Sequence, residues 1–301
     1  MSDPYLLHIF SETKNVSPFD INMAYEANYD AVIPYCNVEL DEVHGLTQDT
    51  IFSRRPEGVK RTGIFIGGRD FHLAVDMLDA ARAAMVPPFE VSVLADPSGA
   101  ITTAAAMVAI AENRLQIHSQ SSMQGAKVAI FGGTGPVGTC VGLLAASAGA
   151  EVSIVSHQGA GAAQFVADRC RKKYGYVMRG ADGSDSEAIA EVLTASEVIF
   201  NTAKAGVRVV EPAHLAVGSE LKVAVDANAV PPSGIADVAA NDKHKVLDDS
   251  PRKAIGVGAL AVGDIKYRVH TGLLEKMYQS DKPVYLAHEE AFAFARGIVE
   301  E

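Results

Sequence analysis

KVAIFGGTGPVG, residues 127–138, joins an apolar strand pattern to a helical one through a glycine-rich turn. Lys127–Phe131 has the continuous apolar character of a buried parallel strand. The glycines that follow it, Gly133, Gly135 and Gly138, have the spacing G-x-G-x-x-G. Strand, turn and helix in this order predict a dinucleotide-binding unit of the Rossmann type.

Each glycine of the turn has its own expected role. Gly133 permits a tight turn, Gly135 lets the backbone approach a diphosphate, and Gly138 lets helix and strand pack closely. The helix start offers free amides and a partial positive charge to the phosphates. A purely structural glycine turn is the alternative, but a second strand pattern at Glu151–Ser156 favours NAD or NADP. The expected contacts are Gly133, Thr134, Gly135, Pro136, Val137 and Gly138.

The end of the second strand pattern bears on the choice between NAD and NADP. An acid at this point would bind the ribose 2′-hydroxyl and repel a 2′-phosphate. Here the residues are Ser156, His157 and Gln158, with neither an acid nor an arginine. We therefore expect both nucleotides to be accepted, with Ser156 and His157 near the ribose, although His157 as an exposed loop residue is equally compatible. Thr202, Ala203 and Asn228 follow later strands and either contact the nucleotide or cap loops.

Short apolar runs alternate with helical patterns along most of the chain, which predicts two α/β/α domains with mostly parallel sheets. The predicted strands are Tyr5–Phe10, Ala31–Tyr35, Gly63–Ile66, Val91–Ala95, Lys127–Phe131, Glu151–Ser156, Ala195–Asn201 and Lys222–Ala227. The predicted helices are Pro18–Asn28, Asp70–Met85, Gly99–Leu115, Thr134–Ala148 and Gly159–Tyr174.

A polar stretch, His118–Gly125, interrupts the alternation and is the expected linker. The tail from Lys266 is helical in pattern, without a strong strand, and is expected to pack back on the first domain. We therefore predict a discontinuous substrate domain, residues 1–121 with 267–301, and a Rossmann domain, residues 122–266.

Composition limits the partners. The 301 residues carry a formal net charge of −11, which repels nucleic acid. No apolar run is long enough to span a membrane, and no secretory signal is recognisable. The three cysteines, Cys36, Cys140 and Cys170, form no metal-ligand set, and Cys140 falls on a helical pattern as core filler. We expect a cytoplasmic protein that requires no metal.

Several segments along nearly the whole chain resemble the methylene-tetrahydromethanopterin dehydrogenases of methylotrophic bacteria. The matching segments are Ser17–Asp20, Ile66–Gly68, Thr102–Ala106, Gly132–Gly138, Asp226–Ile235 and Gly256–Lys266. The double-proline segment Asp226–Ile235 and the run Gly256–Lys266 are the specific ones. Relatives with no basic residue after the second Rossmann strand use NAD as well as NADP, and Ser156-His157-Gln158 is similar to that form.

The resemblance implies a reaction as well as a fold. The family transfers a hydride from N5,N10-methylene-tetrahydromethanopterin to NAD(P)⁺, and the carbon that loses the hydride lies between two nitrogens that stabilise the resulting cation. No proton moves at that carbon, so the chain needs no general base. Its expected work is to align the reacting groups and to exclude water.

The resemblance also implies substrate residues, with the pterin in a cleft between the domains. Asp20 is expected at the pterin nitrogens, or alternatively as a carboxylate that only stabilises a helix start. Thr102 and Thr103 either bind the pterin or bond back within their helix. Lys266 is expected near the reacting carbon in a positioning role, or as an exposed lysine.

Other functions remain possible from sequence alone. One is another two-domain NADP-dependent enzyme, such as a relative of shikimate dehydrogenase, glutamyl-tRNA reductase or methylene-tetrahydrofolate dehydrogenase, which shares the second-domain layout. A non-enzymatic one is a redox sensor that binds NAD(P) without turnover. Resemblance to the family also predicts a homo-oligomer.

Overall fold

The structure, a computed structural model, describes residues 3–300. Met1, Ser2 and Glu301, which fall at the ends of the predicted domains, lie outside the described residues. The chain divides into two compact units: residues up to Thr102 with Tyr267–Phe294, and Thr103–Lys266 with the residues from Ala295 on. The predicted linker is only partly open chain, because its first two residues complete helix α5 (Ala100–Ser119).

A five-stranded parallel sheet forms the centre of the first unit. Its order is β12-β4-β3-β1-β2, and its strands are β1 (Leu6–Phe10), β2 (Ala31–Tyr35), β3 (Thr62–Ile66), β4 (Ser92–Ala95) and β12 (Tyr285–Leu286). The tail thus contributes an edge strand that the sequence pattern did not reveal. Two residues are too few to show a period, and β12 is a strand only because it pairs with β4.

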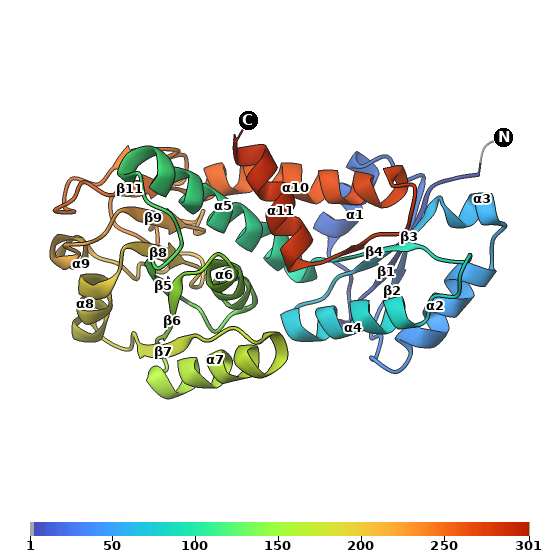
Figure 1. Cartoon of the computed structure of the whole chain (residues 1–301), viewed down its shortest axis with the longest axis horizontal. Coiled ribbons are helices and arrows are strands. Elements are labelled where there is room, and N and C mark those ends of the chain that lie inside the picture. Colours follow the sequence, from blue (N-terminus) through green and yellow to red (C-terminus); the bar gives the residue numbers. More distant parts are fainter. Residues whose placement is uncertain (1–2, 301) are drawn as a thin grey trace. The chain divides into compact units, whose positions relative to one another are not determined.

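The helices of the first unit are α1 (Pro18–Glu26), α2 (Val43–Phe52), α3 (Pro56–Val59), α4 (Phe71–Ala83), and parts of α10 (Ala259–Gln279) and α11 (His288–Glu300). Two of them, α1 and α4, begin at a residue whose side chain caps the helix. Asp70 caps α4, because its Oδ1 accepts hydrogen bonds from the amides of His72 and Leu73 at 2.8 and 3.0 Å. Figure 1 shows α2 and α4 on one side of the sheet. Tyr278 of α10 donates a hydrogen bond of 3.1 Å to the carbonyl of Ala27, which ends α1.

A seven-stranded sheet forms the centre of the second unit, in the order β10-β11-β9-β8-β5-β6-β7. The strands are β5 (Lys127–Phe131), β6 (Glu151–Ser156), β7 (Arg179–Asp182), β8 (Val198–Asn201), β9 (Val223–Asp226), β10 (Lys245–Val246) and β11 (Ile255–Val257). Only β10 is antiparallel to its neighbour. The predicted fold class, two α/β units with mostly parallel sheets, is confirmed.

Helices lie on both faces of this second sheet. They are α6 (Pro136–Ser147), α7 (Ala160–Tyr174), α8 (Ser186–Ala195) and α9 (Pro212–Val217), with α6 on one side and α8 and α9 on the other (Figure 1). Phe131 of β5, Leu193 of α8 and Leu215 of α9 share one buried core cluster. Each buried side chain of this size stabilises the fold by roughly 1.5–3 kcal/mol. Cys140 of α6 is fully buried, as its helical pattern predicts.

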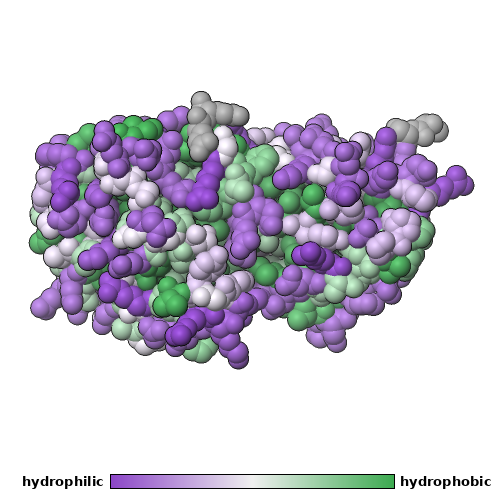
Figure 2. All heavy atoms as spheres, viewed as in Figure 1, coloured by the Kyte–Doolittle hydropathy of each residue, from purple (hydrophilic) through white to green (hydrophobic). Residues whose placement is uncertain are grey.

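The surface is mainly polar. Figure 2 shows a face on which hydrophilic side chains predominate and apolar ones appear in small, separate groups. No helix in the described part of the chain is both long and apolar enough to cross a membrane.

Candidate functional site

The order of strands in the second unit identifies the edge where a ligand is expected. β5 lies between β6 and β8. From β5 the chain proceeds to β6 and β7 on one side, and then returns to β8 on the other side of β5. This reversal is a topological switch point, and ligands of open parallel sheets bind beyond the carboxyl ends of the strands at such a point.

A cavity of about 420 Å³ lies at this edge. It is lined by Phe131, Gly132, Thr134, Gly135, Val155, His157, Gly183, Thr202, Ala203, Lys204, Val207 and Val209. These residues belong to the carboxyl ends of β5 and β6 or to the loops that follow β5, β6, β7 and β8. Lys204 brings a formal positive charge to the lining, whereas no carboxylate is among the lining residues, so the cavity suits a phosphate-bearing ligand.

Gly132 makes the sharp turn out of β5. Its φ is +71°, a left-handed conformation that side chains other than glycine rarely adopt. A Cβ on Gly132 would also lie 2.5 Å from the amide nitrogen of Ala203. The sequence motif assigns the tight turn to Gly133, and this assignment is one residue too late, because periodic spacing does not report φ.

The other glycines of the turn differ in what surrounds them. A Cβ on Gly133 would lie 2.8 Å from the carbonyl oxygen of Ile130, and one on Gly138 would lie 2.6 Å from that of Gly132. These two positions are closed by the protein itself. A Cβ on Gly135 would meet only the carbonyl oxygen of Gly132, at an ordinary 3.5 Å. The fold therefore leaves room at Gly135, on the side that lines the cavity.

The amino end of α6 faces this turn with open hydrogen-bond donors. Gly135 is the N-cap residue and supplies no side chain to bind the first amides. Pro136 occupies the first helical position and has no amide proton, whereas Thr139 donates to the carbonyl of Gly135 at 2.8 Å. The amides of Val137 and Gly138 lie between them and have no acceptor within the helix. Together with the helix dipole they make this helix start suited to an anion.

His157 and Thr202 border the cavity from opposite sides of β5. His157 is exposed and lines the cavity, whereas the adjacent Ser156 is buried and accepts a 3.1 Å hydrogen bond from the amide of Gln158. The Thr202 hydroxyl donates to the carbonyl of Phe131 at 3.0 Å, which ties the loop after β8 to the end of β5.

Asn228 is placed in the loop behind the cavity. Its Oδ1 accepts hydrogen bonds from the amides of Gly206 and Val230, both at 3.0 Å, and its Nδ2 donates to the carbonyl of Pro232 at 2.9 Å. Asn228 is 4% exposed and is not among the lining residues. Its contact with a nucleotide stays a prediction, while its hydrogen bonds hold the loops after β8 and β9 together.

The first unit gathers its predicted site residues near the carboxyl ends of its strands. Asp20 of α1 is 3% exposed, and its Oδ2 lies 3.3 Å from where a Cβ on Gly67 would stand, directly after β3. Thr102 is fully buried, and its hydroxyl donates a 2.6 Å hydrogen bond to Oδ2 of Asp96, directly after β4. Thr103, with which the second unit begins, is half-buried. Thr102 is thus committed to Asp96, while Thr103 keeps some exposure.

Lys266 lies within α10, and its side chain is half-buried. It belongs to the second unit in the division of the chain. Its role near the reacting carbon stays a prediction.

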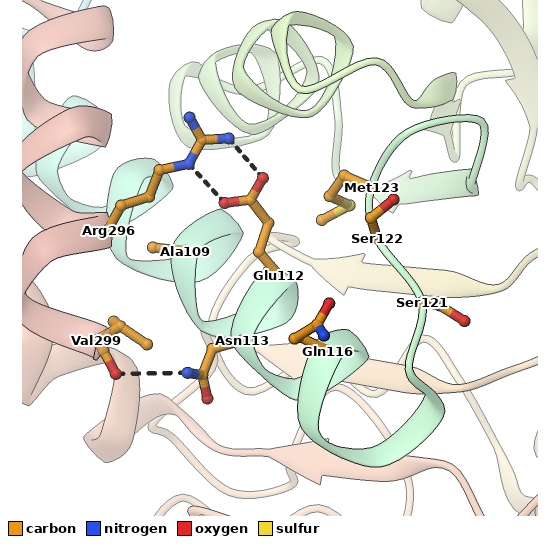
Figure 3. Close-up of a pocket in the computed structure, with 9 residues that line it drawn as sticks. All are labelled: Ala109, Glu112, Asn113, Gln116, Ser121, Ser122, Met123, Arg296 and Val299. Atoms are coloured by element: carbon orange, nitrogen blue, oxygen red, sulfur yellow. Dashed lines mark hydrogen bonds and ion pairs between the residues drawn. The ribbon is translucent and has the colours of Figure 1, made fainter. Parts of the chain in front are cut away.

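Two further cavities of the second unit are less suited to a dinucleotide. Figure 3 shows the smaller one, about 240 Å³, between α5 and α11, where Arg296 and Glu112 form a two-pronged ion pair at 2.6 and 2.7 Å. The larger one, about 660 Å³, lies at the amino ends of β9 and β11, the edge opposite to the glycine turn. Its Lys222 is already paired with Glu197 at 2.6 Å.

Within residues 3–300, no cluster of three or more His, Cys, Asp or Glu side chains is arranged to hold a metal ion.

Comparisons with known proteins show which family the chain is similar to. Residues 18–98 match the family model described as methylene-tetrahydromethanopterin dehydrogenase, N-terminal. The NAD(P)-dependent methylenetetrahydromethanopterin dehydrogenase of Methylorubrum extorquens is 39% identical over 290 residues, which cover 96% of this chain and 97% of that protein. The bifunctional protein MdtA of the same organism is 31% identical, over 94% of this chain and 96% of its own length.

Solved structures show the same fold at much lower identity. Shikimate 5-dehydrogenase of Listeria monocytogenes aligns with a TM-score of 0.51 and 13% identity, covering 98% of this chain and 96% of that one. The malic enzyme of Entamoeba histolytica also gives a TM-score of 0.51, with 14% identity, over 98% of this chain and 74% of its own. At these identities the likeness concerns the fold alone.

Proposed function

The chain belongs to the methylene-tetrahydromethanopterin dehydrogenase family, and we propose on this basis that it transfers a hydride from N5,N10-methylene-tetrahydromethanopterin to NAD(P)⁺. The product is methenyl-tetrahydromethanopterin. The reaction is a step in the oxidation of one-carbon units at the level of formaldehyde. The observation that carries the proposal is the 39% identity to the Methylorubrum dehydrogenase over almost the whole length of both chains.

The second unit supplies the nucleotide site. The diphosphate is placed against the amides of Val137 and Gly138, beside the open position at Gly135. Thr134, His157, Thr202 and Ala203 border the same cavity. Lys204, which the motif did not point to, adds a positive charge. When bound, NAD(P)⁺ supplies the hydride acceptor.

The chain's own residues have a limited chemical task in this reaction. The carbon that loses the hydride is flanked by two nitrogens, which stabilise the positive charge that remains. No proton is transferred there, so the side chains bind, orient and exclude water instead of acting as general bases. Asp20 and Thr103 are proposed to bind the pterin, while the hydroxyl of Thr102, the other threonine expected at the pterin, is bonded to Asp96. Lys266 is proposed as a positioning group at the reacting carbon.

Both nucleotides are proposed to be accepted. No acid is among the residues that line the cavity, so no lining carboxylate would repel a 2′-phosphate. A cytoplasmic location and a homo-oligomeric state are further proposals that follow from the family.

A steady-state assay tests the function. Purified protein is mixed with NAD⁺ or NADP⁺ and one of three substrates: methylene-tetrahydromethanopterin, methylene-tetrahydrofolate or shikimate. We expect absorbance at 340 nm to rise with the methanopterin carrier and not with shikimate. Nucleotide binding without turnover of any of the three would indicate a sensor, and turnover of shikimate alone would refute the proposal.

A further inference from the structure

Phe19 is an exposed aromatic residue directly beside the proposed pterin ligand Asp20. It is the second residue of α1, and its side chain is 42% exposed. Ser17 fixes the start of this helix, because its hydroxyl accepts a 3.2 Å hydrogen bond from the amide of Phe19. The backbone that carries the ring is therefore held in place.

A buried histidine supports the Phe19 ring. His270 of α10 is 0% exposed, and its ring meets that of Phe19 edge-to-face, with centroids 5.7 Å apart and planes at 82°. His270 also stacks on Phe65 of β3, at 5.7 Å and 28°. The exposed ring of Phe19 thus packs against the ring of His270, which packs in turn against Phe65.

A carboxylate lies against the imidazole of His270. Its Nδ1 lies 3.0 Å from Oδ2 of Asp96, and both side chains are fully buried. Asp96 is immobilised by the amides of Ile101 and Thr102, at 2.8 and 3.1 Å, and by the Thr102 hydroxyl at 2.6 Å. Neither ring nitrogen of His270 makes a hydrogen bond with the described residues, so the contact with Asp96 is one of charge and proximity.

This arrangement is a costly way to fill a core. A buried carboxylate–imidazole contact with a ring nitrogen left unsatisfied loses solvation that an apolar side chain would not lose. Leucine or phenylalanine at position 270 would pack between Phe19 and Phe65 without that loss. What the polar pair provides instead is a charged contact behind Phe19, because His270 lies against the Asp96 carboxylate and against the rings of Phe65 and Phe19.

We propose that Phe19 is a substrate-binding residue whose exposed face stacks on the planar part of the pterin, with His270 and Asp96 as its positioning residues. The inference rests on the proposed function and adds a contact to it. Aromatic rings stack favourably on flat heterocycles. Asp20, the next residue, is proposed to bind the pterin nitrogens, so one turn of α1 supplies both the stacking face and the polar contact.

Exposed phenylalanine is ordinary in itself, and the chain offers a matched control. Phe52 of α2 is 53% exposed and its ring contacts that of Phe89, with centroids 5.6 Å apart. Phe19→Leu removes the ring and keeps apolar bulk, Phe19→Tyr keeps the ring, and Phe52→Leu repeats the loss of a ring elsewhere in the first unit.

The experiment measures KM for methylene-tetrahydromethanopterin, KM for the nucleotide, kcat and the melting temperature. We expect Phe19→Leu to raise the pterin KM about tenfold, equivalent to about 1.4 kcal/mol, with the nucleotide KM and melting temperature unchanged. Phe19→Tyr is expected to stay within about twofold of wild type, and Phe52→Leu to have no effect on the pterin KM.

His270→Phe tests the positioning role, because it keeps aromatic packing and removes only the contact with Asp96. It is expected to raise the pterin KM about threefold in the wild-type background and to have no further effect on Phe19→Leu. A Phe19→Leu enzyme with a wild-type pterin KM would overturn the inference while leaving the function intact. A wild-type enzyme that does not oxidise the carrier would refute the function itself.

Discussion

Asn201 Nδ2 donates a 2.8 Å hydrogen bond to Oδ1 of Asp226, which joins the carboxyl ends of β8 and β9 behind the nucleotide cavity. Asp226 is 1% exposed and also accepts from the amides of Asn228, Gly234 and Ile235, at 2.9, 2.7 and 3.0 Å. One buried carboxylate therefore holds the end of β8 and the double-proline segment Asp226–Ile235 together.

Asp226→Asn is expected to destabilise the second unit. The new amide group would replace one acceptor oxygen by a donor, which would face backbone amides or the Asn201 amide with no acceptor. Leaving such buried groups unsatisfied costs about 1–3 kcal/mol, and each kcal/mol lowers the melting temperature by roughly 2–4 °C in a unit of this size. Calorimetry of the variant checks the loss, and an unchanged melting temperature would show that Asp226 is not the organising residue of these loops.

Gly135→Val is expected to weaken nucleotide binding without unfolding the protein. The φ of Gly135 is −79°, which valine adopts, and a Cβ there meets only one atom at 3.5 Å. The new side chain would occupy space proposed for the diphosphate, so we expect Kd to rise about tenfold or more, equivalent to about 1.4 kcal/mol.

Gly132→Ala provides the contrast, because its positive φ and its contact with Ala203 make the damage structural. We expect the melting temperature of this variant to be lower than that of the wild type, whereas that of Gly135→Val is unchanged. The check is a nucleotide titration of the folded Gly135→Val protein. A Kd equal to that of the wild type would argue against our placement of the diphosphate.

His157→Asp is expected to select against NADP. His157 lines a cavity without carboxylates, and an acid there would repel the 2′-phosphate while leaving the NAD ribose free to bind. We expect the KM for NADP to rise about tenfold with little change for NAD, about 1.4 kcal/mol of discrimination. The uncharged control His157→Asn should change neither value by more than about twofold. Equal losses for both nucleotides in the Asp variant would place the ribose elsewhere.

The two threonines at the start of α5 should respond differently to loss of the hydroxyl. Thr102→Val removes a 2.6 Å hydrogen bond to the buried Asp96 and is expected to cost about 1–3 kcal/mol of stability. Thr103→Val affects a half-buried residue and is expected to raise the pterin KM with little loss of stability. Thermal melts and pterin titrations of both variants separate the roles, and the reverse pattern would exchange the assignments.

Lys266→Ala is expected to lower kcat by more than it changes nucleotide binding, because the proposed role is to position the reacting carbon. The measurement is kcat with saturating carrier, set beside the nucleotide Kd of the same preparation. A variant with wild-type kcat would remove Lys266 from the site.

The sequence reveals strands where apolar runs are long, and misses them where pairing alone creates them. Lys127–Phe131 and Glu151–Ser156 are strands in the structure over the same residues. β7 was missed because Arg179–Asp182 has no apolar period and becomes an edge strand only beside β6. β12 contains two residues and is formed by its partner β4.

The site shows the same limit. The glycine spacing located the turn, but the residue with positive φ is Gly132, which only the backbone conformation reveals. Lys204, Val207 and Val209 reach the cavity because the loop after β8 folds over it, and no motif marks that loop. The His270–Asp96 contact joins residues far apart in the chain, so no local pattern reports it.

A crystal structure of the protein with NADP⁺ tests the central claim most directly. The account predicts density for the diphosphate within hydrogen-bonding distance of the Val137 and Gly138 amides, with the nucleotide extending along the cavity between His157 and Lys204. A nucleotide bound at the amino-end cavity near Lys222, or a glycine turn closed by neighbouring side chains, would contradict it.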